Sequence, residues 1–263
     1  MNLREISIHP KFAGVLDALV GLLFLYAFTA IKSPTALVIW FFARVFLWAV
    51  LIRCAYYPDT IKRFWHLLCL VLFGFGVSFL LLFIEWKYSW YVIGAIFVFF
   101  PLVSFFLLPT REVKLSFEMK PYRRWRFWLS AFGLFGIWSG AYATLFLQIA
   151  DINKFIVLFF CSALSAACGH WWWREYQIEN TRKTKMWTAC LLLFMLEISW
   201  AAYLWPLGYF STALVVMWFW YVVWLLARFH LLPAGINWQK QSAFFITNGV
   251  LFAIFLFFVA RWK

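Results

Sequence analysis

Long, uninterrupted apolar runs are the feature that most constrains this chain. A helix needs roughly 20 apolar residues to cross a bilayer, and the sequence contains about nine runs of that length. We predict membrane spans over residues 12–31, 34–52, 64–84, 88–108, 126–148, 155–173, 186–204, 206–229 and 243–260. The runs are apolar around the whole helix rather than along one stripe, which is typical of helices in lipid or inside a bundle.

Composition supports the same fold class. The chain has 263 residues and is 66% hydrophobic, whereas soluble domains are about 45–50% apolar. A soluble core stops growing near this chain length, so it cannot bury that much apolar surface. We therefore predict an all-α polytopic transmembrane helical bundle that forms a single integral membrane domain over 1–263, with no separate soluble domain. Eight spans, with one hairpin that does not cross, remain the alternative.

The basic residues predict an orientation. When successive spans alternate in direction, 17 Lys and Arg residues fall on one side and 5 on the other, while Arg44 lies within a span and completes the total of 23. The positive-inside rule assigns the richer side to the cytoplasm. The N-terminus is then cytoplasmic and the C-terminus lies outside the plasma (inner) membrane. Because these charges flank apolar spans, the net charge of +13 does not indicate nucleic-acid binding.

The densest basic cluster covers residues 120–126, where an expected loop over 109–125 meets the start of the fifth predicted span. It contains Lys120, Arg123, Arg124 and Arg126. Juxtamembrane clusters attract anionic lipid headgroups, with about 1 kcal/mol for each charge. The cluster therefore predicts either a simple topology anchor or a contact site for anionic lipid or a partner.

Three ionisable residues lie well within predicted spans: Asp17, Arg44 and Glu197. Such a residue costs at least about 2.5–3.5 kcal/mol to insert, so a partner or a function is expected. Asp17 and Arg44 lie about 8 and 12 Å from the cytoplasmic ends of two spans that a short loop joins. Arg44 can extend toward the headgroups, and we predict an Asp17–Arg44 ion pair.

Glu197 is expected about 16 Å deep, near the middle of the membrane. Three interpretations stay open: Glu197 shares Arg44, it is protonated and bonds a neighbouring helix, or it carries a proton in a transporter. A transporter predicts a water-accessible cavity at Glu197. A packing role predicts a dry side chain with a hydrogen-bond partner.

No sequence motif points to enzyme chemistry. The sequence has no Walker loop, dinucleotide glycine fingerprint or HExxH motif, and we predict no catalytic residue, no metal site and no cofactor. Gly136 and Gly140 have the spacing of a GxxxG helix-packing motif. Ser162, Ser165, Ala166 and Gly169 have the same four-residue spacing on the sixth span, so we expect spans five and six to approach closely.

Nineteen tryptophans are present, and about twelve lie at predicted span ends, where indole rings favour the membrane interface. We place Trp171, Trp172 and Trp173 in that belt. The deeper group includes Trp218, Trp220 and Trp224, whose N–H groups need partners in a dry interior. Helix packing is the favoured role for this group, and a stacking pocket for a ligand is the alternative.

The last quarter of the chain, about 197–263, carries a loose set of residues that includes Glu197, Trp200, the run Pro206-Leu207-Gly208-Tyr209, Tyr221, Arg228, His230 and the terminal Ala260-Arg261-Trp262-Lys263. In these it resembles a family of small multi-pass bacterial membrane proteins that has no assigned activity. The resemblance implies a bacterial plasma membrane.

The sequence thus predicts a non-enzymatic membrane component. We expect it to bind lipid, another membrane protein or a second copy of itself. The alternative is a proton- or ion-coupled secondary transporter that uses Glu197 with Asp17 and Arg44. An intramembrane enzyme stays open as a third class, and it predicts several polar groups that converge in one pocket.

Overall fold

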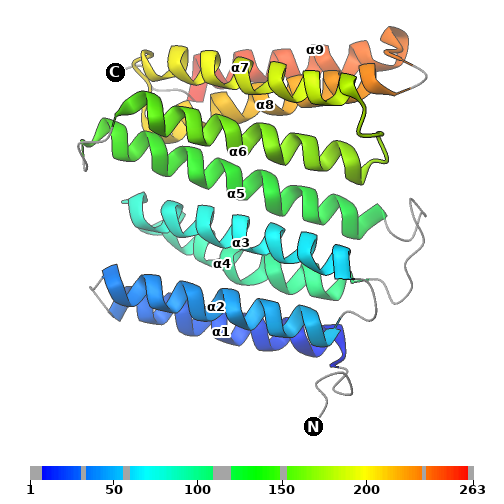
Figure 1. Cartoon of the computed structure of the whole chain (residues 1–263). Helices are drawn as coiled ribbons and strands as arrows, with labels where there is room; N and C mark the ends of the chain where they lie inside the picture. The colour runs from blue at the N-terminus through cyan, green and yellow to red at the C-terminus, as the bar shows by residue number, and fades with distance from the viewer. Residues whose placement is uncertain are drawn as a thin grey trace. The chain divides into compact units, whose positions relative to one another are not determined.

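The computed structural model describes residues 8–30, 34–55, 60–108, 120–148, 153–232 and 235–259. These residues form nine α-helices, a final π-helical segment and no strand (Figure 1). Each of the nine is long and apolar enough to cross a membrane, which confirms the predicted all-α fold class. The elements are α1 (Pro10–Ala30), α2 (Pro34–Ala55), α3 (Thr60–Phe83), α4 (Lys87–Phe106), α5 (Lys120–Phe146), α6 (Lys154–Glu175), α7 (Arg182–Tyr203), α8 (Tyr209–Leu231), α9 (Trp238–Ile254) and η1 (Phe255–Val259).

Local signals in the sequence set several helix ends. Pro10 and Pro34 begin α1 and α2, where a missing backbone N–H is tolerated. Asn153 caps α6, because its side-chain oxygen accepts a hydrogen bond from the Phe155 N–H at 2.9 Å. Thr181 caps α7 through the Thr184 N–H. The basic cluster before the fifth span lies within α5, which begins at Lys120, and this corrects the loop expected up to residue 125.

The chain divides into two compact units, which we call unit 1 (Met1–Ile137) and unit 2 (Trp138–Lys263). The boundary falls within the continuous helix α5, rather than in a linker.

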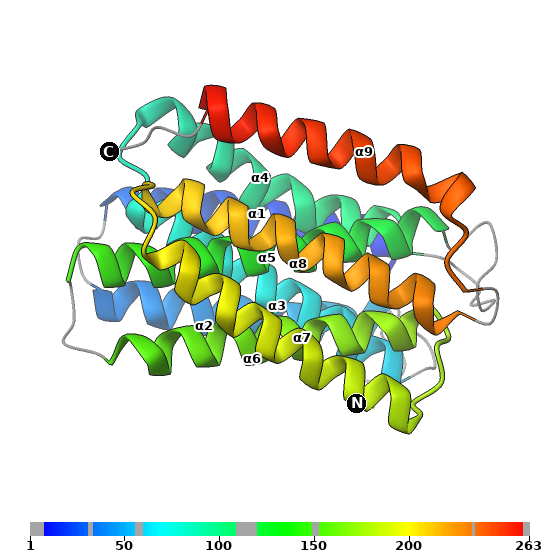
Figure 2. The ribbon, with the colours of Figure 1, turned by 90° about the horizontal axis from the view of Figure 1, so that it is seen from above.

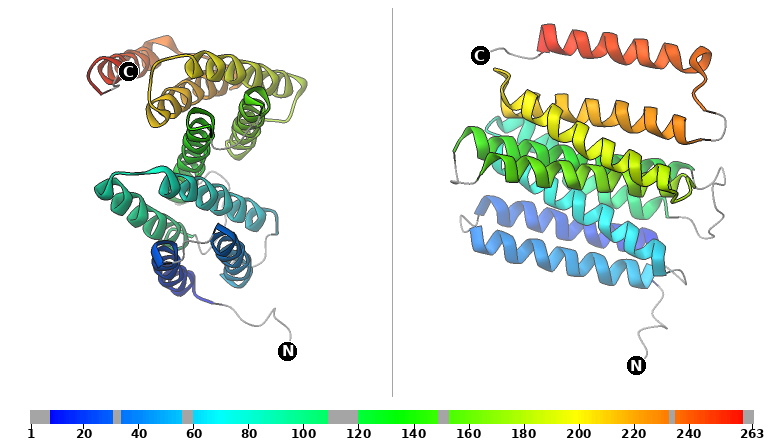
Figure 3. Two further views of the ribbon diagram at one scale, coloured as in Figure 1. Left: turned by 90° about the vertical axis from the view of Figure 1, so that its left-hand side faces the viewer. Right: turned by 45° about the horizontal axis from the view of Figure 1, so that its top comes forward.

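Four helices of unit 1 form a closed ring of contacts. α1 packs against α2 and α4, and α3 packs against the same two helices. The end-on view on the left of Figure 3 shows these helices as the four corners of that ring. Large side chains fill its interior, including Phe24, Trp48, Phe73, Phe97 and Phe105.

The first part of α5 packs on α3 through glycine. A methyl group added at Gly76 of α3 would overlap the Gly133 carbonyl of α5, and one added at Gly136 would overlap the Gly76 carbonyl. Glycine at these positions allows two helix backbones to touch. Gly136 is thus a helix-packing residue, but its partner is α3 rather than the sixth span. Gly140 is buried.

In unit 2, α7 packs against α6 and α8, which also contact one another. α9 runs along α8 (Figure 2), where the Phe252 ring lies 5.6 Å from the Trp218 ring and 5.3 Å from the Phe219 ring. No residue of Gln241–Phe258 is buried, and each is exposed or half-buried. This helix is therefore the least enclosed of those in unit 2.

Indole rings connect α6 to α8. Trp220 donates to the Ser165 carbonyl at 2.9 Å, and Trp224 donates to the Gly169 carbonyl at 3.1 Å. Trp173 reaches back from α6 to the Trp224 carbonyl at 3.2 Å. These bonds favour the packing interpretation of the deep tryptophans.

The run Trp171–Trp173 differs from its expected position in the interfacial belt. All three side chains are buried in unit 2. The position of a tryptophan along a predicted span does not reveal its burial, because a tryptophan near a span end can face either the bilayer or a neighbouring helix.

Candidate functional site: a buried ion pair and an exposed glutamate

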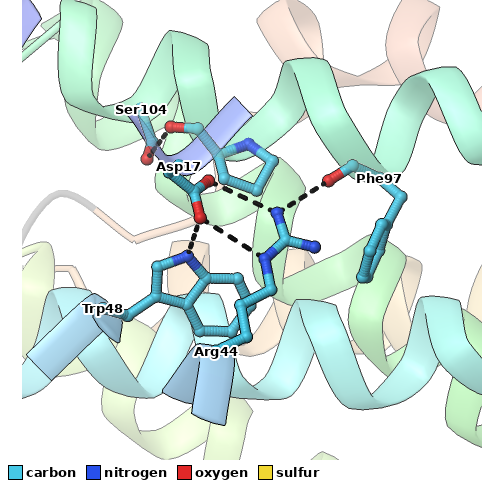
Figure 4. A network of polar contacts seen from close by, with 6 residues as sticks. Asp17, Arg44, Trp48, Phe97 and Ser104 are labelled. Carbon is cyan, nitrogen blue, oxygen red and sulfur yellow. Dashed lines mark hydrogen bonds and ion pairs between the residues drawn. The ribbon is translucent and has the colours of Figure 1, made fainter. Parts of the chain in front are cut away.

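Asp17 and Arg44 form an ion pair in the interior of unit 1. Arg44 Nε lies 3.3 Å from Asp17 Oδ1, and Arg44 Nη2 lies 3.3 Å from Oδ2, so the guanidinium binds the carboxylate in a two-pronged manner (Figure 4). Asp17 is 0% exposed and Arg44 is 1% exposed. The pairing predicted from their depths in neighbouring spans is confirmed.

Trp48 completes the environment of the Asp17 carboxylate. Its indole N–H donates to Asp17 Oδ1 at 2.6 Å. Trp48 follows Arg44 by one helical turn, so both side chains extend from the same face of α2 toward α1. The carboxylate accordingly accepts three hydrogen bonds, and such bonds offset the cost of holding a charge away from water.

Aromatic rings enclose the Arg44 guanidinium. Its central carbon lies 4.8 Å from the centre of the Trp48 ring and 4.1 Å from that of Phe97. Arg44 Nη1 has no hydrogen-bond partner among the described residues. Attraction between the cation and the ring faces partly compensates for that missing bond, because aromatic faces carry negative charge density.

A proline in α4 supplies another acceptor for Arg44. Pro101 lies four residues after Phe97 and has no N–H to bond the Phe97 carbonyl, which a regular helix would use. That carbonyl instead accepts from Arg44 Nη2 at 3.4 Å. The network thereby links α1, α2 and α4.

Gly21 of α1 provides room for the guanidinium. A methyl group at Gly21 would lie 3.0 Å from Arg44 Nη2. Because Gly21 has no side chain, Arg44 of α2 can lie against α1 there and reach the Asp17 carboxylate, which is one helical turn before Gly21 on α1.

A neighbouring polar contact joins α3 to α4. The Ser104 hydroxyl donates to the Pro101 carbonyl at 2.7 Å and lies 3.1 Å from His66 Nε2. Because the hydroxyl proton is already used, the geometry assigns the His66 Nε2–H as the donor to Ser104. Both side chains are fully buried.

Glu197 has a contrasting environment in unit 2. It lies on α7 with an exposed side chain. Within the described part of the chain it has neither a hydrogen-bond partner nor an ion-pair partner. Arg44 pairs with Asp17. The packing interpretation predicted a dry Glu197 with a hydrogen-bond partner, and the described residues contradict it, because the side chain is exposed and has no described partner.

The basic cluster at the start of α5 is not uniformly exposed. Arg124 is exposed, Lys120 and Arg123 are half-buried, and Arg126 is buried with its guanidinium 5.3 Å from the Tyr122 ring. A headgroup site here would therefore use Arg124 first. Arg126 belongs to the interior of unit 1.

Sequence reasoning missed Trp48 and the Phe97 carbonyl as members of the buried network. The four-residue spacing of Arg44 and Trp48 was one available signal, since it places both on one helix face. The four-residue spacing of Phe97 and Pro101 was another, because proline releases that carbonyl. The identity of the helix that approaches it had no sequence signal.

No group of three or more His, Cys, Asp or Glu side chains is arranged to hold a metal ion in the ranges that the structure describes. Comparison with protein-family models, curated proteins and solved structures finds no match to this chain. The assignment of a function therefore depends on the two acidic residues and their surroundings.

Proposed function

We propose that the protein is a non-enzymatic integral membrane component that binds other membrane proteins. The observation that carries the proposal is the exposed Glu197 on a helix of membrane-spanning length. A polar side chain that faces hydrocarbon is costly, and helices in membranes relieve that cost by hydrogen bonding to another helix. α7 therefore presents a surface that gains stability from a partner.

The internal polar groups of unit 1 support the same proposal. Asp17 and Arg44 are enclosed, hydrogen-bonded and mutually neutralising. A carboxyl that carries protons in transport must exchange them with water on both sides of the membrane. The closed environment of Asp17 favours a role in holding α1, α2 and α4 together.

We propose further that the protein resides in the plasma membrane with its N-terminus in the cytoplasm. The 17-to-5 division of Lys and Arg supports this orientation. The exposed Arg124 and its half-buried neighbours add a contact with anionic headgroups on the cytoplasmic side.

Affinity purification from native membranes in a mild detergent tests the binding function. Tagged wild-type protein should retain its membrane-protein partners, including an untagged copy of this chain expressed beside it, and tagged Glu197→Leu should lose them. Glu85→Leu is the matched control, because Glu85 is also exposed but lies between α3 and α4, outside both helices. Equal recovery of all proteins with the wild type and Glu197→Leu would contradict the proposal.

A further inference from the structure

The exposed face of α7 follows a heptad pattern. Successive spacings of four and three residues connect six exposed positions: Met186, Cys190, Leu193, Glu197, Trp200 and Leu204. We call this set the α7 seam. The four large apolar members are 43–67% exposed. Alternating spacings of three and four residues define the contact line of two helices that pair with a left-handed supercoil.

Small residues border the seam. Ala189 and Ala201 are exposed next to it, and Cys190 is itself small. Small side chains allow two membrane helices to approach closely. Glu197 is the one carboxylic acid within the seam, and a single strongly polar residue on such a line fixes the register of the paired helices.

We propose that the α7 seam binds the α7 seam of a second copy of this chain. Two copies inserted by the same topology signals have the same orientation, so their α7 helices run parallel. Equivalent heptad positions face one another in a parallel pair. Glu197 then meets Glu197 of the second copy at the same depth, and Cys190 meets its equivalent.

Carboxyl chemistry makes this contact self-complementary. A protonated carboxyl offers one O–H donor and a carbonyl acceptor, so two such groups satisfy each other. A two-fold interface needs this property, because each patch must match itself. This inference rests on the proposed function and deepens it by naming the partner.

Disulfide cross-linking in native membranes tests the inference with a residue that the chain already has. Cys190 is the exposed member of the five cysteines, whereas Cys54 is half-buried and the other three are buried. A membrane-permeant oxidant such as copper phenanthroline should produce a covalent dimer of the wild type. The dimer should be absent in Cys190→Ser and should persist in Cys54→Ser.

Register and specificity are tested in the Cys190→Ser background. Leu193→Cys, on the seam, should restore the dimer. Ile246→Cys is the matched control, since Ile246 is 66% exposed on α9 and lies off the seam. In the wild-type background, Glu197→Leu should weaken dimerisation about 5- to 30-fold, the range for a lost interhelical hydrogen bond, whereas Glu197→Gln should retain it.

The outcomes separate this inference from the proposed function. Absence of a Cys190 dimer, or equal cross-linking through Ile246→Cys, would overturn pairing between two copies. Capture of a different membrane protein in a Glu197-dependent manner would also overturn it, while leaving the binding function intact. Failure of both the dimer and every Glu197-dependent capture would remove the proposed function as well.

Discussion

Two acidic residues on membrane-length helices have opposite environments in the two units. Asp17 in unit 1 is fully buried and accepts bonds from Arg44 and Trp48. Glu197 in unit 2 is exposed and has no described partner. An acidic residue within a membrane-spanning helix can therefore face either the protein interior or the protein surface, whatever its position along the helix. Under the proposed function, the exposed Glu197 takes its partner from another molecule, whereas the buried Asp17 has its partners within the chain.

The largest expected effect is on the internal ion pair. Arg44→Met should destabilise unit 1 by about 3–5 kcal/mol, because it leaves the Asp17 charge buried without its partner. Unfolding of the purified protein in detergent measures this loss. Arg53→Met is the control, since Arg53 is exposed near the end of the same helix.

A double variant sharpens that result. Asp17→Leu combined with Arg44→Met should recover much of the lost stability, because no uncompensated charge remains. If the double variant loses the sum of the two single effects, the pair does not act as a unit and the account of Asp17 is wrong.

The next largest effect concerns the backbone contact between α3 and α5. Gly76→Ala should cost about 1–3 kcal/mol, because the added methyl group meets backbone atoms that cannot move aside without separating the helices. Thermal unfolding compares it with Gly249→Ala on α9, where the added methyl group meets nothing within 4 Å. Equal unfolding temperatures for the two variants would contradict the close contact.

A smaller effect is expected in unit 2, whose interior uses indole-to-carbonyl bonds. Trp224→Phe should cost about 0.5–1.5 kcal/mol for the lost bond to Gly169, together with a loss of ring contacts. Trp238→Phe serves as the comparison, because Trp238 is 61% exposed. An unchanged unfolding midpoint for Trp224→Phe would show that these bonds do not stabilise the α6–α8 contact.

Sequence reasoning predicted much of the fold because membrane spans are set by length and hydropathy. The nine helices of the described residues follow from the length of the apolar runs. The pairing of Asp17 with Arg44 follows from their predicted depths in two neighbouring spans. The partner of Gly136 and the burial of Trp171–Trp173 did not follow. Both depend on which helices become neighbours, and all-round apolar helices carry no stripe that would identify the neighbour.

The same reasoning explains the open question at Glu197. The sequence predicts a depth for Glu197 but not the direction of its side chain, because most of the surrounding residues of α7 are apolar. The heptad line became visible only when the exposed positions of α7 were known. The spacing of residues defines a contact line on a helix only when the positions that face the rest of the protein are known and left out.

Sedimentation velocity in a mild detergent most directly tests the claim that Glu197 has an intermolecular partner. Wild-type protein should sediment as a dimer, and Glu197→Leu should shift toward the monomer, with the unfolding midpoint of the wild type diluted to its monomeric state. A Glu197→Leu protein of unchanged mass but lower unfolding midpoint would contradict the account, because it would place the partner of Glu197 within the same chain.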